Sequence, residues 1–515
     1  MTIINIWQEI ITTALVGTEK QTLSLTINDN QLGKLLNKLN SQLAVNDKAG
    51  VLLSAVAAIS LYKRSGNLSL KANLIKNLTS IEACEITDLP YCNSRASEYL
   101  AWMLKGEHRE ILREWLTKVK LTGKRVPEKY LPDLLDLGKK ESKLQDFILP
   151  VLGKRGRWLA KQNPDWTYAL EVNSEESWVN GNSQERRLFL KKLRSEDPHQ
   201  ARELIQETFS KENAADRSSF LQTLEIGLSK EDEEFLEKAL GDRSKEVKRT
   251  AANLLSKLPE SKLCQRMIAR VQPLLQLQGE TINITLPEVC DAEMMRDGIE
   301  SMNSPGNLSD KSWWLMQMLG AVPLNIWQEN WQIKINNLKL LIMAACNSDF
   351  SDSLLGGWVL AVQRFRDENW AEALLSAWPN KIDYKQMQLI LPVLNIDRQE
   401  AFAITVLQRD RQLPAGQRLA SKLLYQYKYT WSINLTRAVL DFLVLQITDT
   451  SNNYDWEFRS GLKHFACYMN LQILPETSTL VSANLKLNNV WTKEVIDEFI
   501  NILQFRRDML AGFEE

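Results

Sequence analysis

Histidine and cysteine are scarce in this sequence, and their scarcity argues against several chemistries. The 515 residues include three histidines and six cysteines, and no two cysteines form a C-x-x-C pair. So few cysteines argue against a disulfide scaffold and indicate buried thiols in a reducing compartment. His464 and Cys467 lie three residues apart on a predicted helix, but no second pair completes a zinc site. We therefore expect no metal and no cofactor.

Glycine, proline and long apolar runs are also rare. The chain has 21 glycines and 15 prolines, a low usage that favours helices. The longest apolar stretch, residues 51–61, is about eleven residues long, which is too short to cross a bilayer. The first nine residues have no basic segment, and Glu9 interrupts any apolar one. We expect a cytoplasmic protein without a signal peptide and without membrane insertion.

Neither sign of charge is in excess over the whole chain. Lysine and arginine total 63, aspartate and glutamate total 64, and the formal net charge is -1. A chain-wide nucleic-acid footprint is therefore not expected. Residues 105–161 carry 15 Lys and Arg against 8 Asp and Glu, so a local basic face stays open as an alternative.

Apolar residues recur at helical spacing between residues 182 and 258. Residues 247, 251, 254, 255 and 258 follow the i, i+4, i+7, i+8 and i+11 positions of one helix face. Ser229 and Asp232 have the spacing of a capping box before a further helix. Each short helix has a single apolar face, which it buries by stacking on its neighbours. The predicted fold is all-α, a HEAT- or armadillo-like α-solenoid of stacked helix pairs.

The stretch Asp242–Leu258 resembles the second half of a HEAT repeat. Its turn aspartate and apolar positions match that pattern, whereas a lysine stands where the repeat has arginine. Because lysine lacks the planar fork of arginine, we do not expect the usual contact between the turn aspartate and this position. We assign a structural role in the repeat to Asp242, Val247, Lys248, Ala251 and Leu255.

A second resemblance covers most of the chain. Three blocks carry it: Ala14–Glu19, Pro150–Ala160 followed by Asn163–Trp166, and Asp242–Leu258. Together they resemble an uncharacterised bacterial family of unknown function with HEAT-like helices. The genes of that family tend to lie beside genes for MoxR-type AAA+ ATPases, von Willebrand A domain proteins and SWIM zinc-finger proteins. The resemblance implies membership of a multiprotein assembly and implies no chemistry.

The sequence changes character between residues 273 and 310. Residues 280–287 alternate polar and apolar side chains and end at a proline, the pattern of a short strand or extended segment. We expect two helical lobes on either side of this segment. The predicted regions are an N-terminal helical region (1–150), a HEAT-like repeat region (151–272), an irregular linker with a short strand (273–310) and a C-terminal helical region (311–515).

Residues 153–157 combine two glycines with three cations. They lack the Walker spacing and its Ser or Thr, so we do not expect nucleotide hydrolysis, and no G-x-S-x-G elbow indicates a nucleophile. One interpretation is a corner between helices in which the glycines relieve crowding. The other is a partner-binding corner that takes an acidic segment. For the second interpretation the contact residues are Lys154, Arg155, Arg157 and Trp166, with Arg186 and Arg187 nearby.

The alternative function is that of a HEAT-like nucleic-acid-binding protein or DNA glycosylase with a basic concave groove. Trp115, Trp158 and Trp166 are the candidates for stacking on bases. The opposing interpretation places tryptophans in the core and the charges on a solvated face. Trp313 and Trp314 lie about 100° apart on a predicted helix, so at most one can be centrally buried and the other can lie in a groove.

We therefore expect a non-enzymatic scaffold or adaptor that binds other proteins, and we assign no catalytic residue. A stacked helical array holds inner-face side chains in fixed positions, so a partner docks with little reordering. The resemblance implies the partners, a MoxR-type AAA+ ATPase and a von Willebrand A domain protein.

Overall fold

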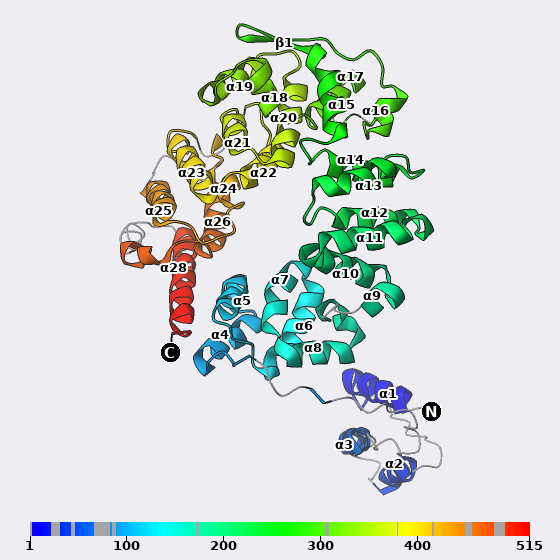
Figure 1. Cartoon of the computed structure of the whole chain (residues 1–515). Coiled ribbons are helices and arrows are strands. Elements are labelled where there is room, and N and C mark those ends of the chain that lie inside the picture. Colours follow the sequence, from blue (N-terminus) through cyan, green and yellow to red (C-terminus); the bar gives the residue numbers. More distant parts are fainter. Residues whose placement is uncertain are drawn as a thin grey trace. The chain divides into compact units, whose positions relative to one another are not determined.

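The structure is a computed structural model, and it is mostly helical with one two-stranded sheet (Figure 1). It divides into two compact units, Met1–Ala83 and Cys84–Glu515. The residues that it describes are 3–21, 31–42, 47–65, 83–84, 89–170, 175–302, 304, 308–378, 380–414, 417–448, 456–477 and 490–514.

The described part of the first unit contains α1 (Ile3–Val16), α2 (Gln31–Gln42) and α3 (Lys48–Ser65). Helix α3 contacts both α1 and α2. Their apolar faces meet in a small core built around Ile10, Leu36 and Ile59. This small core is a different cluster from the core of the second unit.

The second unit consists of many short helices and one hairpin. Before the hairpin come α4 (Ser94–Leu104), α5 (Leu112–Leu121), α6 (Leu131–Lys140), α7 (Gln145–Ile148), α8 (Gly153–Gln162), α9 (Glu175–Asn180), α10 (Ser183–Glu196), α11 (Pro198–Thr208), α12 (Ala214–Thr223), α13 (Glu233–Ala239), α14 (Lys245–Leu255) and α15 (Lys262–Val271). The hairpin is β1 (Leu275–Gln278) and β2 (Thr281–Ile284).

After the hairpin the described chain continues through helices only. These are α16 (Ala292–Arg296), α17 (Asp310–Leu319), α18 (Asn325–Asn330), α19 (Leu338–Cys346), α20 (Ser351–Phe365), α21 (Glu368–Leu375), α22 (Tyr384–Ile390), α23 (Ile396–Asp410), α24 (Ala420–Leu424), α25 (Ile433–Thr448), α26 (Trp456–Ala466) and α28 (Val490–Ala511).

Local sequence signals set the ends of these helices. The side chain of Asn182 caps α10, and Glu185 completes the capping box. Asp197 caps α11, and Pro198 occupies its first turn, where a missing N–H costs nothing. The N–H of Ser229 donates to Asp232 at 3.0 Å, as the predicted capping box requires.

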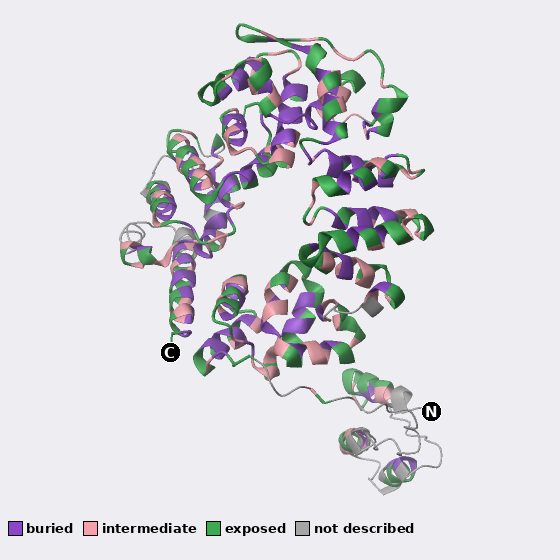
Figure 2. Ribbon diagram, in the orientation of Figure 1, coloured by how far each residue is buried: buried purple, intermediate pink, exposed green. Residues whose placement is uncertain are grey.

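The core of the second unit runs through its whole length. Buried apolar faces of successive helices meet, and α12 packs on both α10 and α14 (Figure 2). The predicted face of α14 is buried, because Val247, Ala251 and Leu255 have no exposed surface. Full burial of these side chains stabilises the unit by about 1.5–3 kcal/mol for each large one.

The hairpin lies in the segment for which the sequence predicts a strand. Strand β2 pairs with β1 in an antiparallel register that places Gln278 opposite Thr281. Gly279, in the turn, has a φ of +60°, which favours glycine. The β1 strand was not expected. The hairpin lies inside the second unit, since α15 contacts α17 and β2 contacts α19. The units therefore divide after Ala83, whereas the sequence places region boundaries near residues 150, 272 and 310.

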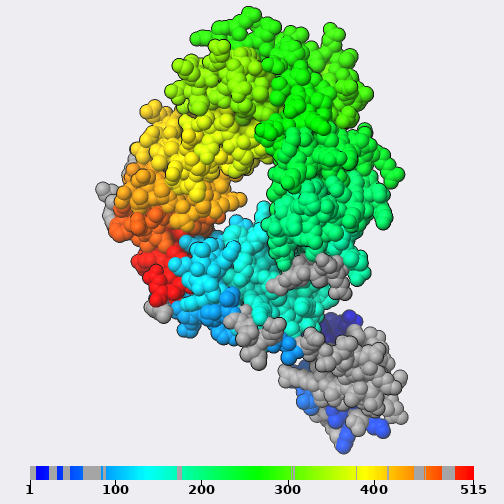
Figure 3. All heavy atoms as spheres, in the orientation of Figure 1, coloured from blue at the N-terminus to red at the C-terminus, as the bar shows by residue number. Residues whose placement is uncertain are grey.

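The last helix of the second unit packs on its first helices. Helix α28 contacts α4 and α5, so the run of helices closes on itself. Arg506 donates to both oxygens of Glu114, at 2.6 and 2.7 Å, and Asn93 donates to the carbonyl of Gly512 at 2.6 Å. Figure 3 shows the red C-terminal segment against the blue and cyan segments.

Ion pairs link neighbouring helices in the repeat region. Arg194 is fully buried and donates to both oxygens of Asp232, at 3.2 and 2.9 Å. The turn aspartate, Asp242, accepts from Arg217 at 2.9 Å and from the N–H of Ser244. The HEAT pattern has an arginine at the position of Lys248. In this protein Arg217, on α12, makes the contact with the turn aspartate instead. Because Arg217 lies 25 residues earlier, this replacement is not evident from the repeat pattern.

Candidate binding groove

Residues of helix α14 line two adjoining cavities. The inner cavity, of about 590 Å³, lies among α12, α14, α17 and α20, and the outer cavity, of about 820 Å³, lies between α14 and residues 292–302. The two share Glu246, Arg249 and residues 298–300. We call the pair the α14 groove. Its combined size suits a ligand or a short segment of a partner.

One wall of the inner cavity is the packed pair α12 and α14. The hydroxyls of Ser218 and Thr250 lie 2.9 Å apart and join the two helices. Lys257 reaches back across the pair to Glu225 at 2.5 Å. These contacts occupy the carboxylate of Glu225, which also lines the cavity.

The opposite wall includes residues 298–302. Contacts with α17 hold these residues in place. The side-chain amide of Gln317 bonds both the N–H and the carbonyl of Glu300, at 2.9 and 3.1 Å. Trp314 donates to the carbonyl of Ser301 at 3.2 Å. Gly298 has a φ of +89°, and a Cβ there would lie 2.5 Å from the Cβ of Ala252 on α14. This close approach to α14 requires glycine.

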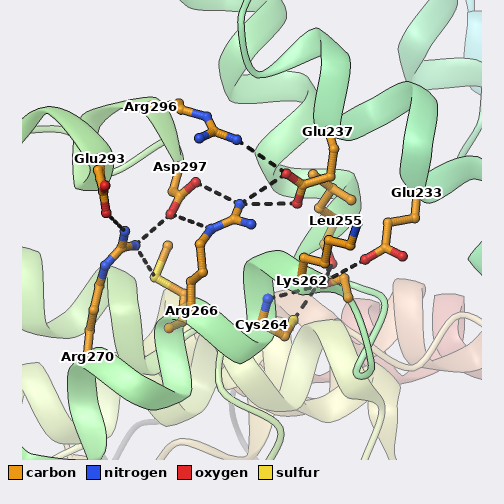
Figure 4. A network of polar contacts seen from close by, with 12 residues as sticks. Glu233, Glu237, Leu255, Lys262, Cys264, Arg266, Arg270, Glu293, Arg296 and Asp297 are labelled. Atoms are coloured by element: carbon orange, nitrogen blue, oxygen red, sulfur yellow. Dashed lines mark hydrogen bonds and ion pairs between the residues drawn. The ribbon is translucent and has the colours of Figure 1, made fainter.

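A polar network centred on Asp297, which also lines the inner cavity, joins this wall to neighbouring helices (Figure 4). Asp297, which ends α16, is buried and accepts from Arg266 at 2.7 and 2.8 Å and from Arg270 at 2.7 Å. Arg266 also reaches Glu237 on α13 at 3.1 Å. Burial would lower the pKa of Arg266, but the hydrogen bonds to Asp297 and Glu237 outweigh it and raise the pKa. The network joins α13, α15 and α16, and three hydrogen bonds from arginines occupy both oxygens of Asp297.

Two half-buried donors in the inner cavity, Arg364 and Trp313, have no acceptor among the described residues. Arg364, in the last turn of α20, makes no hydrogen bond or ion pair with a described residue. The residue as a whole is half-buried, yet its guanidinium is deep enough for burial to lower its pKa to about 10. It is therefore still charged at neutral pH. Trp313 lines the same cavity, and its Nε1 is buried without a described partner.

The sequence around Arg364 suggests two acidic partners, but the structure pairs neither of them with it. Asp367 and Glu368 follow it by three and four residues, the spacing of partners on one helix. Helix α20 ends at Phe365, however, and Asp367 instead caps α21. Glu368 lies 3.6 Å from Arg398. The two acids that the sequence offers to Arg364 are thus used elsewhere.

Reactive groups are not gathered in the groove. Its described lining contains no histidine and no cysteine. Cys264 lies near Arg364, but burial raises the pKa of its thiol to about 11, which keeps it protonated and unreactive at neutral pH. No group of three metal-ligating side chains occurs among the described residues.

The predicted corner lies outside the groove. Lys154 and Arg155 are exposed on α8, and Arg157 is half-buried. A Cβ at Gly156 would lie 2.6 Å from the Cβ of Leu152, which supports the interpretation that glycine relieves crowding there. Trp166 is half-buried and donates to Asp136 at 2.9 Å. Partner binding by this corner stays a prediction.

The two other predicted contact residues lie beside the repeat core. Arg186 donates to both oxygens of Glu212, at 3.2 and 2.6 Å, and lies 4.3 Å over the ring of Trp178. Its guanidinium is therefore engaged inside the protein. Arg187 is half-buried, and its Nε is buried without a described partner. Neither residue lines the α14 groove.

The tryptophans proposed to stack on bases differ in exposure. Trp115 is fully buried and donates to the carbonyl of Ala96 at 2.9 Å, so its proposed stacking role is wrong. Trp158 and Trp166 are half-buried. Trp313 lies in a groove while Trp314 bonds Ser301, and neither is fully buried. Sequence reasoning thus placed one of the pair Trp313 and Trp314 in a groove without choosing between them, and it missed Arg249 and Arg364.

All six cysteines are free thiols. In the part of the chain that the structure describes, we find no helix with the length and apolar character to cross a membrane.

Comparison with known proteins identifies the family. The model of a family described as "Family of unknown function (DUF5691)" matches residues 9–513. No curated protein and no solved structure matches the chain. The matched range covers most of the first unit and nearly all of the second. The chain therefore belongs to the DUF5691 family.

Proposed function

We propose that this protein is a non-enzymatic, HEAT-like scaffold or adaptor that binds other proteins through the α14 groove. The observation that carries the proposal is a groove with a half-buried, unpaired cation and with no histidine or cysteine in its described lining. Enzyme sites place ionisable groups where they exchange protons or attack a substrate. In this groove the buried carboxylate is already bound by two arginines.

The solenoid architecture is part of the proposal. Helices close in the chain contact one another along the repeat region, as in α10 with α11 and α12, and α13 with α14. Short, singly amphipathic helices of this kind gain stability by stacking. Such an array presents a rigid surface, so a partner pays little to order it.

The partners and the compartment are proposed from the resemblance and the composition. The family's gene neighbourhoods favour a MoxR-type AAA+ ATPase and a von Willebrand A domain protein as partners. In that assembly the ATPase handles ATP, and this chain supplies a binding surface. We place the protein in the cytoplasm, where free thiols persist.

The first prediction tests this function with a photo-crosslinker in the groove. A photoreactive phenylalanine at position 249, where the arginine is exposed, should crosslink to specific proteins in the native cell. The same group at position 191, an exposed lysine on α10 outside the groove, is the matched control. Mass spectrometry identifies the products.

Recovery of the same products from both positions, or of none, would contradict a protein-binding groove. Binding of the purified chain to duplex DNA that weakens steeply with salt would instead support the nucleic-acid alternative.

A further inference from the structure

We propose that the α14 groove binds an acidic peptide segment of a protein partner, with one carboxylate held by Arg364 and a second by Arg249. This inference rests on the proposed function and specifies the chemistry of the partner. Trp313 supplies an indole donor to the same segment. The outer cavity takes its apolar side chains.

The first argument is the contrast between Arg364 and the buried arginines. Arg194, Arg217 and Arg506 each hold a carboxylate from outside their own helix, at 2.6 to 2.9 Å. Arg364 is placed deep enough for burial to disfavour its charge, yet no described carboxylate faces it. Arg364 is half-buried and makes no hydrogen bond with a described residue, so a bound carboxylate can add charge-assisted hydrogen bonds there. Charge-assisted hydrogen bonds to a carboxylate are also the strongest that a guanidinium makes.

The surroundings of Arg364 leave room for that carboxylate. A Cβ at Gly320, which ends α17, would lie 3.1 Å from the Nη1 of Arg364. The side chain therefore lies against the carboxyl end of α17, which favours a positive charge. Arg364 lines the inner cavity where α17 and α20 pack together, so its guanidinium is held at the cavity.

The outer cavity adds positive charge and apolar surface. Four cationic and two acidic side chains line this outer cavity. The cations are Lys245, Lys248, Arg249 and Arg296. Met295 and Met302 line the same cavity with 46% and 71% of their surfaces exposed. Methionine adapts to differently shaped apolar side chains. Cations beside exposed methionines fit a segment that mixes acids with apolar residues.

An acidic peptide fits this groove better than a nucleic acid does. Glu225 lines the inner cavity, and Glu246 and Glu300 line both cavities, so a continuous phosphate backbone would meet several carboxylates. A peptide carries its charges at separate side chains and can direct them to Arg364 and Arg249 alone. Its backbone is neutral, so the acidic side chains that line the groove do not repel it.

The second prediction tests the inference by fluorescence anisotropy with the full chain. The probe is a fluorescein-labelled 15-residue peptide of alternating glutamate and leucine. The comparison peptide has glutamine in place of each glutamate. We expect the glutamate probe to bind, and the glutamine peptide to bind at least about tenfold more weakly, because the charged hydrogen bonds are lost. Arg364→Gln should weaken the glutamate probe by a similar factor.

Lys191→Gln removes the same charge outside the groove and should leave the affinity unchanged. Circular dichroism melting checks that Arg364→Gln is folded. If it is not, Arg249→Gln is the second variant, because Arg249 is exposed and forms no ion pair with a described residue. Equal binding of both peptides, or full affinity in the folded Arg364→Gln and Arg249→Gln variants, would overturn the inference.

The outcomes separate this inference from the proposed function. If crosslinking at position 249 identifies a protein that the Arg364→Gln variant still binds, the scaffold function stands and the acidic-peptide inference is wrong. If duplex DNA binds and Arg364→Gln abolishes that binding, the groove takes nucleic acid and both proposals are wrong.

Discussion

Single buried side chains show which polar groups the fold itself uses. Arg194 donates to Asp232 and to the carbonyls of Leu224, Ile226 and Gly227, so its donors are satisfied within the protein. Arg364 has no such set. Because a half-buried guanidinium without a partner can still gain charged hydrogen bonds, the exception marks a position where binding can recover free energy.

His464 should make stability depend on pH near neutrality. Its ring packs against Tyr425 and Tyr468, with centroids 4.9 and 5.0 Å away, and its Nε2 is buried without a described partner. Burial, followed by the charge of Lys428, lowers the pKa of His464. Below an unfolded pKa of about 6.5 the unfolded chain therefore binds more protons than the folded one.

The third prediction is that stability falls as the pH drops from 7.5 through the lowered pKa of His464. Urea unfolding at pH 7.5 and 5.5 measures the change. His464→Phe removes the titrating group and should reduce the loss. His199→Gln, at an exposed ring on α11, should leave the loss intact. An unchanged loss in His464→Phe would show that another group causes it.

At the scale of elements, the groove depends on short segments held between helices. Residues 298–302 have no regular structure, and Gln317, Trp314 and the contact of Gly298 with Ala252 hold them. A rigid groove requires these contacts, because a loop without them would have to be ordered by the partner.

The fourth prediction compares Gly298→Ala with Gly279→Ala. Both glycines have positive φ, so both variants pay about 1 kcal/mol of backbone strain. Only Gly298→Ala meets a neighbour, because nothing lies within 4 Å of a Cβ at Gly279. Overpacking of this kind costs about 1–3 kcal/mol more. Chemical denaturation measures the difference, and equal losses in the two variants would contradict the close packing.

At the scale of the whole molecule, long-range contacts close the second unit. Arg506 bonds Glu114 and also the carbonyls of Ala466 and Met469, so α28 is joined to residues both near and far in the chain. Phe505 adds an edge contact with Tyr99 at 5.1 Å. The closure links the two ends of the unit. Local unfolding of one end should therefore destabilise the other end.

The fifth prediction is that Glu114→Gln loosens both ends together. Arg506 has 1% of its side chain exposed, and loss of its carboxylate leaves a buried charge, at a cost of about 3–5 kcal/mol. Amide hydrogen exchange should rise in α4, α5 and α28. Glu476→Gln breaks an exposed ion pair with Arg437 and should change exchange little. Faster exchange confined to α5 would show that the closure does not couple the ends.

Local signals in the sequence were sufficient for the helices and their ends. The buried face of α14, the caps before α10 and α11 and a strand near residue 282 all follow from residues within a few positions of one another. Tertiary structure decided the partners: Arg217 for Asp242, Glu114 for Arg506, and no described acid for Arg364. Those pairings join helices that are distant in the chain. Periodicity indicates which face of a helix is buried, but it does not indicate which helix covers that face.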